Sequence, residues 1–241
     1  MALKDERLYS EILELLLAAT IEPQVWSCVL EKIALLVGHQ YAALLFYDKG
    51  NAQLLTDALL CEEKVFTAYR DVFLALDPAE KILTSAPVGK LYQDREVLGD
   101  KFIASSVYYN EFHRPNDMNY LTSVKLSAVN GYACFLSLMT ANGALYPQQS
   151  HFDLFKRLIP ALITATHLHA RFESLRENLK YQNALLDNHI YPVWLVNGVG
   201  KILYANRHAE HYHDRYRDSW ATCHDTLNIN TDSKKLKQAD R

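Results

Sequence analysis

Two apolar runs joined by an Asn-Gly pair constrain the fold of this chain more than any other feature. Residues 121–129 and 132–140 each have strand length and strand composition, and Asn130-Gly131 is all that separates them. An Asn-Gly pair tolerates the positive φ angles that a two-residue hairpin turn requires. A second such pair, Asn142-Gly143, follows the second run. The pattern predicts an antiparallel hairpin, and therefore a fold built on an antiparallel sheet.

Helical and extended segments surround this hairpin. Apolar, strand-length runs predict three further strands, at 40–47, 54–60 and 86–93. Apolar residues at helical spacing predict helices at 5–20, 23–37, 62–75 and 100–113. Gly38 is expected to end the second helix, and Asp77-Pro78 the third, because proline disfavours helical geometry in the residue before it. Since the helices lie before and between the strands without strict alternation, we expect an α+β domain with an antiparallel sheet of about five strands.

A long helical segment follows at residues 148–187. Two series at seven-residue spacing run along it: Phe155, Leu162 and His169, and then Leu158, Ala165, Phe172, Leu179 and Leu186. A seven-residue apolar repeat is what two packed helices need. Two interpretations stay open. Either this helix pairs with its copy in a homodimer, or it lies against the sheet of its own chain. The residues expected to make the dimer contact are Leu158, Leu162, Ala165, Phe172 and Leu179.

A second, shorter unit is expected at residues 188–226. Residues 192–196 and 201–205 have the composition of two strands around a turn. Asn206 is placed to cap a short helix, because its side chain can accept from the first free N–H groups of that helix. The unit has too few residues to close a core alone, so we expect a partial domain inside which the chain stops. The polar residues 227–241 predict a disordered tail.

Composition and charge exclude several classes of protein. Apolar residues make up 49% and charged residues 22% of the chain, a balance typical of a folded globular protein. The net charge of -3 disfavours a nucleic-acid clamp, because phosphate binding leaves a basic footprint. Glu11 and Glu14 interrupt the first apolar run, which is therefore no secretory signal, and no run approaches the ~20 apolar residues of a membrane span. We expect a cytoplasmic protein without membrane contact.

No catalytic, metal or cofactor motif is visible. The four cysteines, Cys28, Cys61, Cys134 and Cys223, lie far apart and include no Cys-x-x-Cys pair. The sequence has no glycine-rich phosphate loop and no serine nucleophile elbow. Histidines within residues 208–213 have the atoms that a transition metal needs, but their polar neighbours favour a solvated surface. We expect no enzyme activity, no cofactor and no metal.

Aromatic residues indicate a binding role instead. The chain has 15 tyrosines, and many of them lie in its first part. A tyrosine combines an apolar ring with a hydroxyl group that needs a partner when it is buried. A pocket lined in this way suits a small, partly apolar ligand. The alternative is that these rings only fill the core.

One segment carries a family resemblance. Residues 105–118, SSVYYNEFHRPNDM, resemble a segment of bacterial LuxR-type helix-turn-helix transcription regulators. Further segments resemble parts of the same family in the same order, so that the resemblance covers about residues 8–213. They are residues 9–38, 68–78, 151–172 and 185–212.

The resemblance implies a GAF-like or PAS-like sensory domain, a connecting helix and the start of a PAS-like unit. It also implies a DNA-reading helix-turn-helix, but nothing after Asp214 resembles one, so contact with DNA is expected only through a domain absent from this chain. Acyl-homoserine-lactone receptors of the family use a tryptophan, a tyrosine and an Asp-Pro. Here Phe66 and Tyr69 precede Asp77-Pro78, the tryptophan is missing and the spacing differs.

These observations predict a ligand-sensing regulatory region that signals through a dimerising helix. The expected parts are a GAF/PAS-like domain at 1–147, the connecting helix at 148–187 and the partial PAS-like unit at 188–226. The residues expected to bind an unknown small molecule are Phe66, Tyr69, Phe73, Asp77, Tyr108, Tyr109 and Phe112. The alternative is a dimerisation or docking module that senses nothing and has no helix-turn-helix.

Overall fold

The computed structural model describes residues 2–48, 50, 53–129, 132–215, 222–223 and 226–227. The chain divides into two compact units, Met1–Phe172 and Glu173–Arg241, and the long helix α7, Gln149–Asp187, contributes to both. No helix among the described residues has the length and apolar character needed to cross a membrane.

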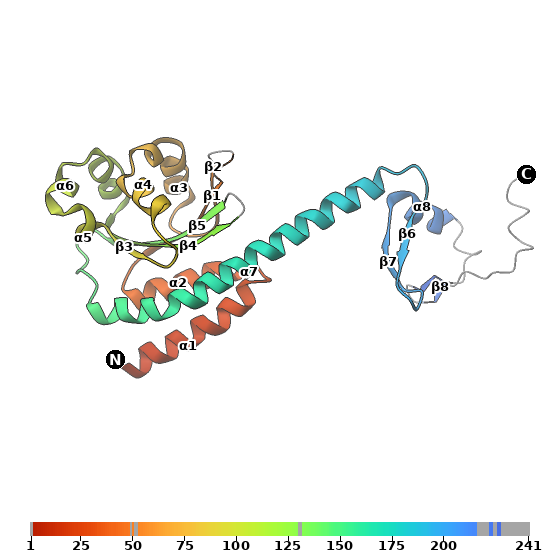
Figure 1. Ribbon diagram of the computed structural model, residues 1–241, viewed down its shortest axis with the longest axis horizontal. Coiled ribbons are helices and arrows are strands. Elements are labelled where there is room, and N and C mark those ends of the chain that lie inside the picture. The colour runs from red at the N-terminus through yellow and green to blue at the C-terminus, as the bar shows by residue number, and fades with distance from the viewer. Residues whose placement is uncertain are drawn as a thin grey trace, which may run out of the picture. The chain divides into compact units, whose positions relative to one another are not determined.

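The first unit is built on a five-stranded sheet. Its strands are β1 (Tyr41–Asp48), β2 (Gln53–Leu60), β3 (Leu91–Gln93), β4 (Met118–Val129) and β5 (Tyr132–Ala141). The spatial order is β2-β1-β5-β4-β3, and every neighbouring pair is antiparallel. Val129 pairs with Tyr132 across the end of the predicted hairpin, whereas the turn residues Asn130-Gly131 lie outside the described residues. The α+β class and the antiparallel sheet flanked by helices are confirmed (Figure 1).

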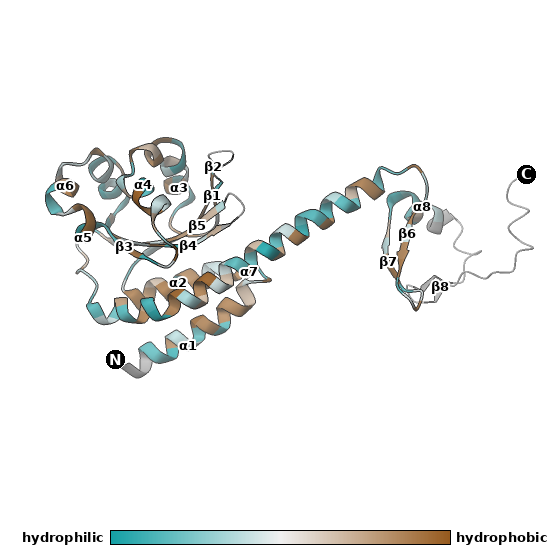
Figure 2. Cartoon of the chain, in the orientation of Figure 1, coloured by the Kyte–Doolittle hydropathy of each residue, from teal (hydrophilic) through white to brown (hydrophobic). Residues whose placement is uncertain are grey.

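Three helices cover one face of this sheet: α1 (Ala2–Ala19), α2 (Val25–Val37) and the first part of α7 (Figure 1). Trp26 of α2 and Phe155 of α7 are fully buried in the core that they share with the sheet. Figure 2 shows α2 as largely hydrophobic, as expected for a helix between the sheet and α1. Gly38 ends α2 as predicted, because its φ of 76° is a left-handed conformation that glycine adopts without strain.

Short helices cover the other face and enclose a second core (Figure 1). They are α3 (Glu63–Ala68), α4 (Pro78–Ser85), α5 (Asp94–Leu98) and α6 (Asp100–Ser105). Two five-residue π-helical turns, η1 (Tyr69–Phe73) and η3 (Tyr109–His113), follow α3 and α6, and each is followed by a 3-10 turn, η2 (Leu74–Leu76) and η4 (Arg114–Asn116). The sheet is therefore buried on both sides.

This layer corrects two predicted helices. The helix expected at 62–75 is only α-helical to Ala68, and the one expected at 100–113 stops at Ser105. Asp77-Pro78 does end the first of them, but it also begins α4, which the sequence did not predict. Asp77 Oδ1 accepts from the Ala79 N–H at 2.8 Å, and Pro78 occupies the first turn, where a missing N–H costs nothing.

The second unit contains the end of α7, the hairpin β6 (Trp194–Val196) and β7 (Ile202–Ala205), helix α8 (Arg207–Arg215) and the short pair β8 (Thr222–Cys223) and β9 (Thr226–Leu227). Asn206 caps α8 as predicted, since its Oδ1 accepts from the Ala209 N–H at 2.8 Å. The tail predicted at 227–241 lies outside the described residues from position 228 onward.

Candidate ligand-binding site

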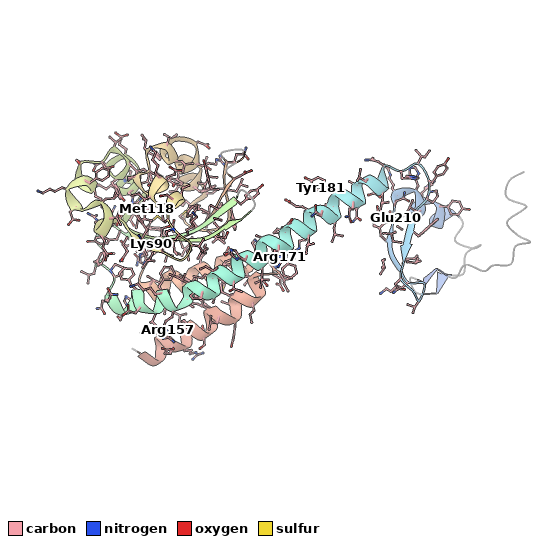
Figure 3. The ribbon with its side chains drawn as sticks, in the orientation of Figure 1. Lys90, Met118, Arg157, Arg171, Tyr181 and Glu210 are labelled. Carbon is pink, nitrogen blue, oxygen red and sulfur yellow. The ribbon has the colours of Figure 1, made fainter. Side chains whose placement is uncertain are left out.

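A pocket lies between the sheet and the short-helix layer of the first unit. It holds about 820 Å³ of empty space, its opening to solvent included. Most of its lining is apolar or aromatic. The lining residues are Ala43, Leu45, Tyr47, Leu54, Leu59, Cys61, Val65, Phe66, Tyr69, Leu74, Asp77, Glu80, Leu83, Thr84, Tyr108, Phe112, His113, Met118, Leu121, Phe135, Ser137 and Met139. Met118 lies among the side chains of this layer (Figure 3).

The floor of the pocket is a face of the sheet with small side chains at its centre. Ala43 of β1 stands directly opposite Ser137 of β5, and Ser137 stands opposite Ser123 of β4. The hydroxyl groups of Ser123 and Ser137 are 2.9 Å apart and hydrogen-bonded. Ala43 and Ser137 both line the pocket, and larger residues in their place would fill it. This pair therefore explains why a pocket exists above the sheet.

The wall opposite is a cluster of aromatic rings brought together by the two π-helical turns. The ring centroids of Tyr69 and Phe112 are 5.6 Å apart and stacked. Those of Tyr108 and Phe112 are 5.5 Å apart, and those of Phe73 and Phe112 are 5.0 Å apart. These separations are typical of favourable aromatic pairs. Single π-helical turns occur frequently at functional sites, because the extra residue redirects side chains.

The polar end of the pocket centres on Asp77. The Tyr69 hydroxyl donates to Asp77 Oδ2 at 2.7 Å, while Asp77 Oδ1 caps α4. Burial raises the pKa of Asp77, although the hydrogen bonds from Tyr69 and Ala79 act in the opposite direction. Burial and the neighbouring carboxylate also hold the pKa values of Tyr69 and Tyr108 well above the usual range of tyrosine. Both phenols are therefore neutral hydrogen-bonding groups.

Three further polar side chains line the pocket. Glu80 lies one helical turn from Thr84 on α4, and the Thr84 hydroxyl donates to Glu80 Oε1 at 3.4 Å. His113 Nδ1 lies 3.4 Å from the Asn119 carbonyl, which can only accept, so this nitrogen carries the proton. Burial lowers the pKa of His113 to about 4, and its ring is neutral at pH 7.

A second buried polar group lies next to this pocket but does not line it. Asp94, Tyr92 and Tyr109 are 1%, 4% and 2% exposed. Burial raises the pKa of Asp94 to about 6. Asp94 Oδ1 accepts from the Arg95 N–H at 2.7 Å. The ring of Tyr109 lies 5.4 Å from that of Tyr108, which connects this group to the aromatic wall.

The predicted ligand residues come together in this part of the structure. Five line the pocket: Phe66, Tyr69, Asp77, Tyr108 and Phe112. Phe73 stacks behind Phe112, and Tyr109 lies behind Tyr108.

Sequence reasoning missed the sheet residues of the floor and the α4 residues Glu80 and Thr84. The Asp-Pro pair at the start of α4 was the available signal for the latter, because it is also a helix-start pattern.

The predicted dimerisation residues fall into two groups. Leu158, Leu162 and Ala165 are at most 4% exposed and belong to the core of the first unit. Their contacts are thus with their own chain, which is the alternative that the sequence left open. Phe172 and Leu179 are 37% and 57% exposed.

Metal-binding groups are not evident among the described residues, where no three His, Cys, Asp or Glu side chains gather. Of the histidines within residues 208–213, His213 has a side chain that lies outside the described residues.

No protein-family model matches the sequence, and no match is found among curated proteins. Solved structures do match. The ligand-binding domain of VqsR from Pseudomonas aeruginosa has a TM-score of 0.56 and 18% identity, over 68% of this chain and 97% of that one. CepR2 from Burkholderia cenocepacia, an N-acylhomoserine-lactone-dependent LuxR family transcription factor, has a TM-score of 0.51 and 14% identity, over 68% and 93%.

A GAF domain is similar to the same extent. The GAF domain of a phosphoenolpyruvate-protein phosphotransferase from Coxiella burnetii has a TM-score of 0.51 and 13% identity, over 72% of this chain and 98% of that one. At such identities the likeness concerns the fold alone. The chain contains the GAF-like fold that LuxR-family ligand-binding domains also have.

Proposed function

We propose that this chain is the sensory region of a LuxR-type transcription regulator, and that it binds a small, partly apolar molecule in the pocket of the first unit. The observation that carries the proposal is the pocket itself. It is lined mostly by aromatic and aliphatic side chains with a few polar groups among them, as is typical of small-molecule sites. The GAF-like fold shared with LuxR-family ligand-binding domains supports the regulatory role.

The sheet gives the pocket a physical connection to α7. Phe135 and Ser137 of β5 face the pocket, while Leu136 and Leu138 of the same strand face the core that contains α7. A ligand that contacts both the sheet and the aromatic wall binds one arrangement of these layers better than another. It then shifts the population toward that arrangement by its difference in affinity.

In this proposal the output passes through α7, and two chains pair along it. Four of the exposed apolar side chains on α7 form one row: Leu168, Phe172, Leu175 and Leu179, which are 38%, 37%, 58% and 57% exposed. Their spacing of four, three and four residues is that of a coiled-coil contact. DNA binding by a helix-turn-helix domain, as in LuxR-type regulators, is the proposed final step.

Native mass spectrometry of the purified protein tests the binding role. We expect an additional mass in gentle spectra that is lost on denaturation. The variant Ala43→Phe fills the floor of the pocket and should remove that mass, whereas Ala104→Phe, at an exposed position of α6, should keep it. An additional mass that both variants retain equally would contradict the proposed site. A ligand-free protein whose melting temperature responds to no small apolar compound would favour the docking module.

A further inference from the structure

The charges that line the pocket are all of one sign. Asp77 and Glu80 contribute two carboxyl groups, and the lining includes no lysine or arginine. His113, the remaining titratable nitrogen of the lining, is neutral at pH 7 because burial lowers its pKa. Lys125 is buried but does not line the pocket, and its ammonium donates to the carbonyls of Thr84 and Ala86 at 2.7 and 3.1 Å.

Asp77 has hydrogen-bonding capacity left on the pocket side. A carboxylate is an acceptor with about four lone-pair positions. The Tyr69 hydroxyl donates to Oδ2, the Ala79 N–H donates to Oδ1, and the Tyr108 hydroxyl is a further hydrogen-bond donor to this carboxyl group, so that about one of the four positions remains. No ion pair to Asp77 occurs among the described residues. A buried carboxylate without a cation is costly, so a charged donor from the ligand would offset that cost. The chemistry of this end of the pocket therefore favours a ligand that brings positive charge.

The aromatic wall points the same way. Tyr69, Tyr108 and Phe112 lie within 5.5–6.4 Å of one another around the end where Asp77 is placed. Aromatic faces attract a cation through their quadrupole, most strongly where water is excluded. Rings combined with carboxylates recognise ammonium groups. The same arrangement disfavours a carboxylate or phosphate, which would meet the carboxyl groups of Asp77 and Glu80 and no lysine or arginine of the lining.

We propose that the pocket selects a ligand with a positively charged nitrogen on an apolar body, with the nitrogen at Asp77 and Glu80 and the body over the Ala43–Ser137 floor. This assignment rests on the proposed function, because it names the ligand class of that same pocket. Anionic ligands are excluded by charge, and neutral ligands of the same shape bind more weakly.

Matched probes test this selection. There are three sets of compounds, with a phenylethyl, a phenylbutyl or an octyl body. Within each set the body is the same, and the head group is an amine, an alcohol or a carboxylate. Isothermal titration calorimetry at pH 7 measures each against the whole chain. In at least one set we expect the amine to bind about tenfold or more tightly than the alcohol, which is ~1.4 kcal/mol, and the carboxylate to bind not measurably.

Two variants assign the effect to the carboxyl groups. Asp77→Asn keeps a capping oxygen for α4, because asparagine is a good N-cap. Glu80→Gln removes the second carboxyl group and serves as the test variant if Asp77→Asn is unstable. Each should bring the amine to within about threefold of the alcohol. Asp71→Asn and Glu63→Gln, at exposed carboxylates outside the pocket, should leave the preference unchanged.

The outcomes separate the two proposals. One outcome is that alcohols or carboxylates bind the unchanged chain as tightly as the amines do and fail to bind the Ala43→Phe variant. That result would overturn the charge selection and leave the binding role intact. Amine preference that survives both Asp77→Asn and Glu80→Gln would also overturn it. Failure of all compounds to bind, together with a ligand-free native mass spectrum, would overturn the charge selection and the binding role alike.

Discussion

The Tyr69 hydroxyl donates to Asp77 Oδ2 at 2.7 Å, and this bond ties the π-helical turn η1 to the first turn of α4. Both residues also line the pocket. One contact therefore fixes the helix start and the polar end of the candidate site together. Because the other oxygen of Asp77 caps α4, substitutions at these two positions have separable effects.

Tyr69→Phe should lower the free energy of unfolding by about 1–3 kcal/mol, because it leaves a buried carboxylate without one of its donors. Asp77→Ala should lose the cap of α4 as well, which costs about 1 kcal/mol. Asp77→Asn should be milder than Asp77→Ala, since its amide oxygen can still accept from the Ala79 N–H. Urea denaturation at pH 7 measures all three. Equal stabilities for the Asn and Ala variants would argue against the capping role.

Asn206 should govern the stability of the second unit. It is fully buried, its Oδ1 accepts from the N–H groups of Val193 and Ala209, and its Nδ2 donates to the carbonyls of Leu186 and Tyr191. Asn206→Ala leaves these four backbone groups without their partner, at about 2 kcal/mol or more. Amide hydrogen exchange should accelerate across β6, β7 and α8, while the strands of the first unit keep their protection. Acceleration confined to the first turn of α8 would show that only the cap matters.

Stability should rise with pH between about 4 and 6.5. Burial lowers the pKa of His39 and of His113 from 6.5 to about 4. The unfolded chain binds protons on these rings first, so the stability that the neutral imidazoles contribute is present above pH 6.5 and is lost as the pH falls. Each histidine accounts for about 3 kcal/mol at most.

Asp94 acts in the opposite direction. Its pKa is raised from 3.8 to about 6, so its contribution to stability is present below pH 3.8 and is lost as the pH rises through 6. For these three groups taken together, the histidines exceed Asp94 and their sum is a gain of about 3 kcal/mol between pH 4 and pH 7. The raised pKa of Asp77 acts in the same direction as that of Asp94 and reduces this gain. Asp94→Asn removes the opposing change and should steepen the rise, as urea midpoints at several pH values would reveal. A variant with an unchanged slope would contradict the assignment.

The sequence predicted those parts of the fold whose signals are local. The hairpin of β4 and β5 and the helices α1 and α2 follow from turn chemistry and apolar periodicity over adjacent residues. The helix predicted at 100–113 was wrong in its length, because it ends at Ser105. The apolar residues on which that prediction was based do not share one buried face of a helix. Phe102 and Val107, which are among them, are 45% and 53% exposed.

The site was predictable in part for the same reason. Its aromatic wall comes from two short segments rich in aromatic residues, which the sequence displays. Its floor depends on the pairing of Ala43 with Ser137, which lie on strands far apart in the chain. Strand register across a sheet is a non-local property, so an alanine and a serine give no signal of a pocket when they are read along the chain.

The seven-residue repeat of α7 illustrates a further limit. Such a repeat predicts that a helix packs against another helix, but it does not distinguish a helix of the same chain from one of a second copy. Leu158 and Leu162 pack within the first unit, where α1 and α2 also lie. Arg157 on α7, which is labelled in Figure 3, pairs with Glu6 of α1 at 2.7 Å. Beyond the first unit the same repeat continues with Leu179, which is 57% exposed, and Leu186, which is partly buried.

The two halves of the repeat should therefore respond differently to substitution. Leu158→Ala removes a fully buried side chain and should lower the free energy of unfolding by about 2–5 kcal/mol. Leu179→Ala should change it by about 0.5 kcal/mol or less in a monomer, because the side chain is 57% exposed.

If chains pair along α7 as proposed, Leu179→Asp should convert the dimer into a monomer while the first unit keeps its stability, because a charge at the centre of a coiled-coil contact is strongly unfavourable. Sedimentation equilibrium measures the mass, and urea denaturation measures the stability of the same samples. Tyr181→Asp is the matched control, since Tyr181 lies two residues further along α7 and therefore off this row of side chains, and it is 70% exposed. A dimer that persists in Leu179→Asp, or that dissociates equally in Tyr181→Asp, would place the interface elsewhere. Because Leu158 is already committed to its own core, that result would remove the seven-residue repeat as a basis for dimerisation.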